Sequence, residues 1–165
     1  MNYKVLISDN LSKGIVNKFQ RAGIDVVYNP EIGKDNSLLL KEICNYDAIA
    51  LRSDTKLNSI VLKNASKLKV IGRAGVGIDN IDLAYASSNG IVVMNTPFGN
   101  AITTAEHTIA MIFAAARNIP AANQSTQSGR WEKKKFIGIE LYKKKLGIVG
   151  VGNIGSIVAS LAQSI

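Results

Sequence analysis

Short β-type runs alternate with amphipathic helical stretches through the first hundred or so residues of this 165-residue chain, and this alternation restricts the fold more than any other feature. Apolar runs rich in Val, Ile and Leu predict strands at residues 4–7, 25–28, 48–51, 68–72 and 91–94. Helical patterns separate them at residues 12–22, 36–45, 58–65 and 83–88. Strands that alternate with helices pair in parallel, and the helices cover the sheet. We therefore predict a small doubly wound, flavodoxin-like α/β domain over residues 1–97.

The pattern changes after Pro97. One long apolar helix is expected over residues 101–118, ended by Pro120, and a polar stretch follows it. The final residues predict a strand at 145–149 and a helix that runs through Ser164. We interpret residues 98–165 as the first part of a Rossmann nucleotide-binding domain, incomplete because a single strand–helix unit is present.

Three glycines, Gly150, Gly152 and Gly155, have the G-x-G-x-x-G spacing of a dinucleotide-binding loop, and a predicted strand and helix flank them. The first permits a tight turn, the second lets the backbone approach a pyrophosphate, and the third allows close strand–helix packing. The alternative is a tight turn with a structural role alone. The acidic residue that would select NAD over NADP is expected about 20 residues further on, beyond Ile165.

A second glycine-rich loop follows the predicted strand at residues 68–72 and runs through residues 73–82. Its glycines free backbone N–H groups to face a ligand, and Arg73 beside them suits a carboxylate or a phosphate. Arg52 and Ser53 follow the preceding strand. Ligands of open α/β sheets bind beyond the carboxyl ends of the strands, so we expect these residues at one edge. A tight loop with surface arginines is the alternative.

Most of the net charge of +8 comes from residues 130–145, which contain seven basic residues and two acidic ones. Such a cluster favours an anionic small molecule, a phosphate or nucleic acid. Because no helix-turn-helix pattern accompanies it, we expect no nucleic-acid partner. A solvated, lysine-rich surface remains the alternative.

Cys44 and His107 are the only residues of their types, so we expect neither a metal site nor an internal disulfide. A capping or interface role is the preferred interpretation of Glu106 and His107, near the start of the long helix. No apolar run is long enough to span a membrane, and the N-terminal strand turns polar too early for a signal peptide. The sequence therefore predicts a cytoplasmic protein.

Several of these segments together resemble the D-isomer-specific 2-hydroxyacid dehydrogenases, and within them the D-3-phosphoglycerate dehydrogenase branch. The resemblance covers essentially the whole chain. Its segments are Arg52-Ser53, residues 73–82, residues 94–100, Ala105-Glu106, residues 129–141 and the glycine fingerprint. The block at 129–141, GRWEKKKFIGIEL, is the part most similar to that branch.

The resemblance implies a two-domain, NAD-dependent enzyme that oxidises 3-phospho-D-glycerate to 3-phosphohydroxypyruvate, the first step of L-serine biosynthesis. It also implies a homo-oligomer, a dimer or a tetramer, in the complete enzyme. Two alternatives stay open. One is another D-2-hydroxyacid dehydrogenase, such as a glyoxylate or hydroxypyruvate reductase, and the other is a non-catalytic binding or oligomerisation domain.

The resemblance also implies roles for particular residues. The substrate would be bound by Arg52, Ser53, Arg73, Ala74, Gly75, Val76, Asn100 and Lys133. The cofactor would be bound by Val76, Gly150, Gly152, Asn153, Ile154 and Gly155. The catalytic arginine, glutamate and histidine of the family match no residue here and are expected beyond Ile165, and His107 is not that histidine. We therefore expect residues 1–165 by themselves to be inactive.

Overall fold

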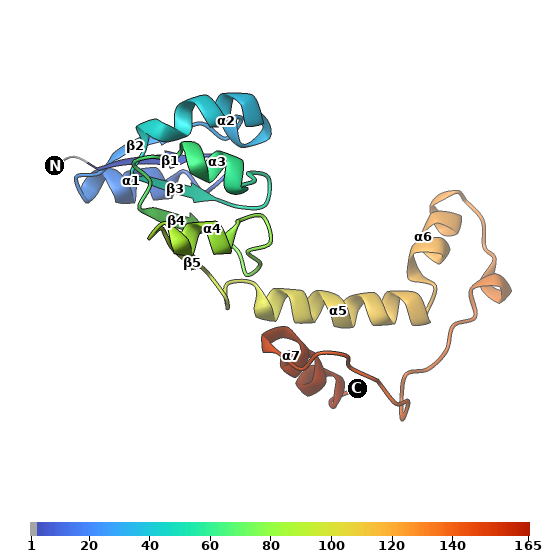
Figure 1. Ribbon diagram of the computed structural model, residues 1–165. Helices are drawn as coiled ribbons and strands as arrows, with labels where there is room; N and C mark the ends of the chain where they lie inside the picture. The colour runs from blue at the N-terminus through green and yellow to red at the C-terminus, as the bar shows by residue number, and fades with distance from the viewer. Residues whose placement is uncertain (1–2) are drawn as a thin grey trace. The chain divides into compact units, whose positions relative to one another are not determined.

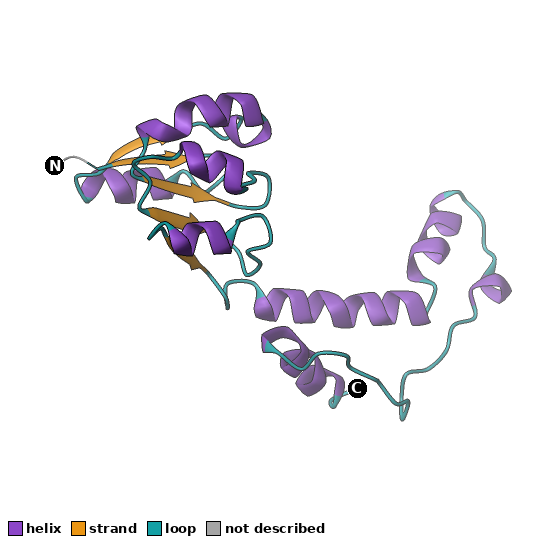
Figure 2. Ribbon diagram, viewed as in Figure 1, coloured by secondary structure: helices purple, strands orange, loops and turns teal. Residues whose placement is uncertain are grey.

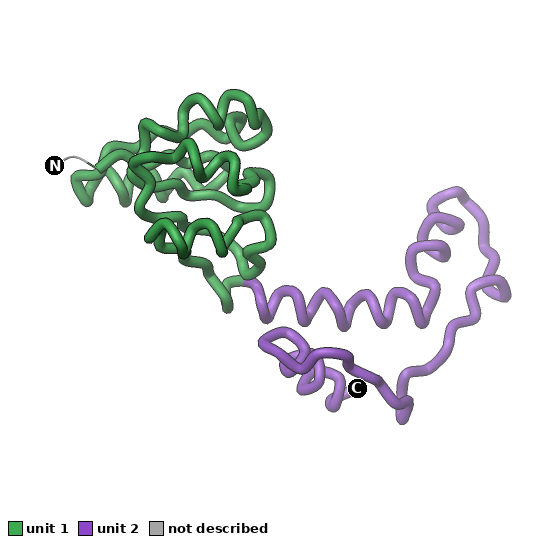
Figure 3. Tube along the Cα trace, in the orientation of Figure 1, with its two compact units in different colours: residues 1–99 green, residues 100–165 purple. Residues whose placement is uncertain are grey.

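The computed structural model describes residues 3–165. The chain divides into two compact units, Met1–Gly99 and Asn100–Ile165 (Figure 3). Each unit has its own secondary structure and is described separately.

The first unit is built on one parallel sheet (Figures 1 and 2). Its strands are β1 (Lys4–Ile7), β2 (Asp25–Tyr28), β3 (Ala48–Leu51), β4 (Val70–Arg73) and β5 (Val92–Asn95). The strand order is β2-β1-β3-β4-β5, and every pair is parallel. This order is the flavodoxin-like one, so the predicted fold class is confirmed.

Helices cover both faces of this sheet. On one face lies α1 (Gly14–Arg21), whose Ile15, Val16 and Phe19 pack against Ile7 and Ala50. The other face carries the larger core, in which the alternate strand residues Leu6, Ile49 and Ile71 are buried. The elements on that side are η1 (Ile32–Lys34), α2 (Asn36–Glu42), η2 (Ile43–Asn45), α3 (Ser59–Asn64) and α4 (Leu83–Ser88).

Side-chain caps explain where three of these helices begin. Asp35 accepts from the N–H groups of the first turn of α2, Asn58 does so for α3, and Asp82 for α4. The ends of α1 and α4 are followed by Gly23 and Gly90, whose φ angles are +72° and +69°. These local signals are why the predicted boundaries lie within a few residues of the observed ones.

The second unit consists of α5 (Ala101–Ala116), α6 (Ile119–Gln127), η3 (Lys133–Phe136) and α7 (Asn153–Ala162), with α7 packed along α5 (Figure 1). The prediction for α5 is confirmed, but the polar stretch after it is a helix that the sequence pattern did not indicate. Asn118 turns the chain in a left-handed conformation with φ +54°. Pro120 then lies in the first turn of α6, where its missing N–H costs nothing.

The predicted strand at residues 145–149 is wrong, because these residues form a loop. A strand is stabilised by hydrogen bonds to a neighbouring strand, and the described part of this unit contains none. Val149 is accordingly fully exposed. Among the described residues, no helix combines the length and the apolar character that a membrane crossing requires.

Candidate functional site

Two arginines meet at the carboxyl edge of the sheet in the first unit. Arg73 is the last residue of β4 and is paired in register with Leu51, so Arg52 follows immediately beside it. The Arg73 Nε–H donates to the main-chain carbonyl of Arg52 at 3.4 Å. Arg52 is exposed, whereas the side chain of Arg73 is only 10% exposed. The expectation that both arginines lie at one edge is confirmed, and their binding roles stay predictions.

The glycines of the loop after β4 leave room for the Arg73 guanidinium. A Cβ atom on Gly75 would lie 3.2 Å from Arg73 Nη1, and one on Gly77 would lie 3.1 Å from it. Neither glycine has a positive φ. Glycine is therefore needed at these two positions because a side chain would crowd the arginine, and not because the backbone has an unusual conformation. Asp79 Oδ1 lies 3.8 Å from Arg73 Nη2, but Asp79 is 90% exposed and makes a weak pair.

The amide groups predicted to hold a carboxylate differ in their partners. The N–H of Ala74 donates to the Leu51 carbonyl at 2.8 Å, and that of Gly75 donates to the Arg73 carbonyl at 3.0 Å. The N–H of Val76 has no hydrogen-bond partner in the described part of the chain. The Val76 carbonyl accepts from Asn95 Nδ2 at 2.8 Å, which holds this turn against the end of β5.

Three residues that the sequence reasoning missed organise the same edge. The carboxylate of Asp9 accepts from the N–H of Arg52, from the N–H of Thr55 at 3.4 Å and from Thr55 Oγ1 at 2.5 Å. Asn80 Nδ2 donates to the carbonyls of Arg52 and Thr55, each at 2.7 Å. The available signal was position: Asp9 lies two residues after the end of the first strand, where parallel α/β sheets place functional polar groups.

The glycine fingerprint forms a tight turn before α7 in the second unit. Gly150 has φ +95°, which only glycine adopts readily, and Gly152 is the residue before the helix. A Cβ on Gly155 would overlap the carbonyl oxygen of Gly150, so the helix can approach the turn this closely only with glycine there. No atom lies within 4 Å of an added Cβ at Gly150 or Gly152. The space beside these two glycines, at the start of the helix, is therefore uncrowded, and the cofactor-binding roles of Asn153 and Ile154 stay predictions.

The basic segment is anchored to the helices before it. Glu132 accepts from Ser125 Oγ at 2.7 Å and pairs with Lys135 at 3.6 Å and Arg130 at 3.8 Å. The Ser125 hydrogen bond is the largest single cause that holds the pKa of Glu132 below its usual value, and Lys135 and Arg130 lower it further. Gly138 lies directly against the backbone of Ala116. These contacts fix the segment while the side chain of Lys133 stays exposed.

The remaining candidates of the second unit are exposed. Asn100 precedes α5 and its carbonyl accepts from Thr104 N–H at 2.9 Å, while its side chain makes no cap. Glu106 and His107 lie on the exposed surface of α5. Across residues 3–165, no three His, Cys, Asp or Glu side chains are grouped so that they could hold a metal ion.

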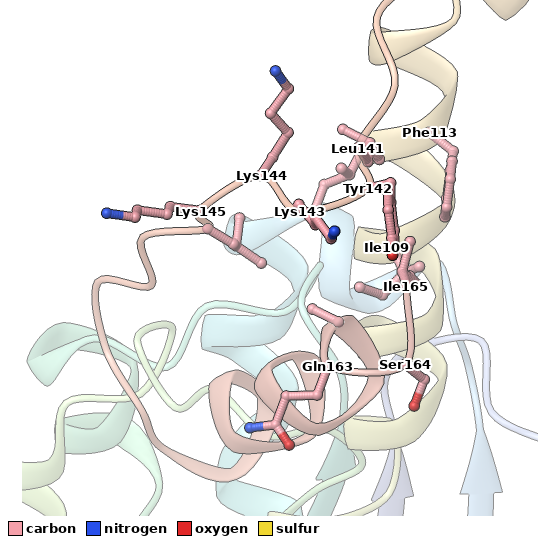
Figure 4. Close-up of a pocket in the computed structure, with 13 residues that line it drawn as sticks. Ile109, Phe113, Leu141, Tyr142, Lys143, Lys144, Lys145, Gln163, Ser164 and Ile165 are labelled. Carbon is pink, nitrogen blue, oxygen red and sulfur yellow. The ribbon is translucent and has the colours of Figure 1, made fainter.

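One hollow of the second unit lies away from the glycine turn. It measures about 480 Å³ and is lined by α5, the loop after residue 140 and the C-terminal end of α7 (Figure 4). Ile109 and Phe113 form an apolar wall, and Lys144 and Lys145 extend away from it. A smaller pocket of about 440 Å³ in the first unit is lined by Ser53 and Asn80, among other residues, beside the arginine edge.

The chain is similar to curated D-3-phosphoglycerate dehydrogenases. It is 44% identical to the one from Archaeoglobus fulgidus and 49% identical to the one from Synechocystis, each over 98% of this chain. The chain spans 30% of the length of the first relative and 28% of the second.

A solved structure and a family model agree with this likeness. The NAD⁺-bound 3-phosphoglycerate dehydrogenase of Entamoeba histolytica matches 99% of this chain and 51% of its own, with a TM-score of 0.76 and 29% identity. The family model for the D-isomer specific 2-hydroxyacid dehydrogenase, catalytic domain, matches residues 5–160. The chain belongs to the D-isomer-specific 2-hydroxyacid dehydrogenase family.

Proposed function

We propose that this chain supplies the substrate-binding domain, residues 1–97, and the first part of the NAD-binding domain, residues 98–165, of a D-3-phosphoglycerate dehydrogenase. The reaction is the oxidation of 3-phospho-D-glycerate to 3-phosphohydroxypyruvate, the first step of L-serine biosynthesis. The observation that carries the proposal is the contact of Arg73 with the Arg52 carbonyl at the sheet edge, in a chain 44% and 49% identical to two enzymes of that name. We expect a cytoplasmic homo-oligomer.

The substrate carries two anionic groups, a carboxylate and a phosphate, and the arginine edge offers complementary donors. Each guanidinium has five N–H donors in a planar fork that suits bidentate bonds to such groups. Arg73 uses one of these in its bond to the Arg52 carbonyl. The unpartnered N–H of Val76 adds a main-chain donor to the same edge.

Residues outside this edge complete the proposed substrate site. Ser53 follows Arg52, and Ala74 and Gly75 shape the turn that presents Val76. Asn100 and Lys133 belong to the second unit. Lys133 is exposed, and we propose that it reaches the site of a neighbouring subunit and contributes a point charge to the phosphate.

The fingerprint residues would hold the cofactor. Gly150 and Gly152 leave space for a pyrophosphate, and the N–H groups of Asn153, Ile154 and Gly155 are free to donate at the start of α7. NAD, when bound, supplies the acceptor for the hydride from the substrate carbon that carries the 2-hydroxyl group. The residues of this chain bind and orient; the proton-transferring groups of the family have no counterpart among them.

The test is an assay of the natural gene product that contains this sequence, with NADH formation as the measurement. We expect turnover with 3-phospho-D-glycerate and little with unphosphorylated D-glycerate. Glyoxylate or hydroxypyruvate reduction as the dominant activity would contradict the assignment. Residues 1–165 expressed alone are expected to form no NADH. If a homogeneous preparation of these residues did form NADH, the proposal that the proton-transferring residues lie outside them would be contradicted.

A further inference from the structure

Two side chains from separate loops, Asp9 after β1 and Asn80 after β4, form hydrogen bonds to the main chain of the same two residues. The N–H groups of Arg52 and Thr55 both donate to the carboxylate of Asp9. The carbonyl groups of the same two residues both accept from Asn80 Nδ2. We propose that Asp9 and Asn80 form a clamp that positions residues 52–55, and with them the anion-binding arginines. The proposal rests on the proposed function, since it assigns positioning residues to that site.

The hydrogen bonds of Asp9 are part of the buried interior and are not contacts at the protein surface. Asp9 is 1% exposed, and Ser8 and Thr55 beside it are fully buried. No cation lies within ion-pair distance of Asp9 among the described residues. A buried carboxylate is costly unless its oxygens are hydrogen-bonded. The donors that compensate for the burial of Asp9 come from residues 52–55. These hydrogen bonds form only when that segment keeps the geometry seen here.

Gly33 packs directly against the carboxylate of Asp9 and the hydroxyl of Thr55. A Cβ on Gly33 would overlap Thr55 Oγ1, and it would lie 2.5 Å from the Ser8 carbonyl oxygen and 2.6 Å from Asp9 Oδ1. The glycine therefore closes the back of the clamp, where any larger residue would displace Asp9 or Thr55.

The clamp reaches the second arginine through one shared atom. The Arg52 carbonyl oxygen accepts from Asn80 Nδ2 and also from Arg73 Nε at 3.4 Å. When this carbonyl is held in place, the main chain of Arg52, from which its side chain extends, is held as well. One hydrogen bond of the Arg73 guanidinium is positioned at the same time. Such preorganisation matters because a small misplacement of binding groups costs activity steeply.

Asn80→Ala in the natural gene product is the principal test, because it removes both donated bonds and leaves no buried charge. We expect the KM for 3-phospho-D-glycerate to rise about 10- to 100-fold, with the KM for NAD unchanged. Asn64→Ala is the matched control, since Asn64 Nδ2 makes the same kind of bond to the Ile60 carbonyl on the exposed side of α3. It should leave both KM values unchanged.

A second variant addresses the carboxylate. Asp9→Asn keeps an acceptor for the Arg52 N–H, whereas Asp9→Ala would leave the N–H groups of Arg52 and Thr55 without one and could prevent folding. Asp9→Asn should raise the same KM, by less than Asn80→Ala does. Asp35→Ala is its control, because Asp35 also accepts from two N–H groups, at the start of α2. That variant lowers stability without changing substrate binding.

Hydrogen exchange of residues 50–57 separates the clamp from the proposed function. Faster exchange there in Asn80→Ala than in Asn64→Ala supports the clamp, and equal exchange overturns it. Faster exchange with an unchanged substrate KM overturns the positioning role. If the unaltered gene product has no activity with 3-phospho-D-glycerate, the proposed function fails, and the exchange result still decides whether the clamp exists.

Discussion

Gly155 lies so close to Gly150 that a side chain on Gly155 would overlap the Gly150 carbonyl oxygen. This contact brings the first turn of α7 onto the glycine turn before it. The two glycines thus have different requirements. Gly150 needs its left-handed φ of +95°, and Gly155 needs the absence of a Cβ.

Substitutions in the fingerprint should separate packing from cofactor binding. Gly155→Ala is expected to lower stability by about 1–3 kcal/mol through overpacking and to abolish NAD binding. Gly152→Ala meets no atom within 4 Å, so the fold should be unchanged while NAD affinity falls. Gly147→Ala, equally open, is the control and should change neither. Thermal melting and NAD titration of the natural gene product measure both effects. Full NAD affinity in Gly152→Ala would rule out close approach of a pyrophosphate.

Alanine at Gly75 or Gly77 is expected to displace the Arg73 guanidinium. The added Cβ would lie 3.1–3.2 Å from Nη1, which is too close for the side chain to stay in place. The substrate KM should rise several-fold with little loss of stability, since the surface loop can yield. Gly72→Ala is the control, because its nearest neighbour would be 4.0 Å away. Equal KM values for the three variants would contradict this account of the glycines.

Lysine at position 52 or 73 tests bidentate recognition. Arg52→Lys and Arg73→Lys keep the charge but lose the planar fork. Because hydrogen bonds to charged groups contribute about 1.5–3 kcal/mol, the KM for 3-phospho-D-glycerate should rise roughly 10- to 100-fold. Arg21→Lys, in the last turn of α1, is the control and should behave as the unaltered protein. Unchanged kinetics in both site variants would exclude these arginines from substrate binding.

Ser125→Ala should raise the pKa of Glu132 toward its ordinary value, because the Ser125 hydrogen bond is the largest cause of its lowering. A lowered pKa in the folded state stabilises the protein above the ordinary pKa of about 4.5. That contribution is lost as the pH falls through the folded-state value. NMR titration of the Glu132 side chain measures the shift. An identical pKa in Ser125→Ala would show that Lys135 and Arg130 are responsible instead.

Local patterns were sufficient for the first unit. Its strands coincide with apolar runs. Helices α2, α3 and α4 begin after the capping residues Asp35, Asn58 and Asp82, and α1 and α4 are followed by Gly23 and Gly90, so these boundaries depend on nearby residues. The structure of the second unit was harder to predict from local patterns. Helix α6 is polar and contains a proline in its first turn, and residues 145–149 form no strand because the described part of the second unit contains no strand to pair with.

The sequence by itself determined the parallel α/β fold, the glycine fingerprint and the meeting of Arg52 with Arg73, since consecutive parallel strands bring their carboxyl ends to one edge. The tertiary structure decided what surrounds those arginines. Asp9 and Asn80 lie 43 and 28 residues from Arg52 along the chain. Their bonds to its main chain leave no periodic signal, because hydrogen bonds to the backbone depend on where the folded strands end rather than on sequence spacing.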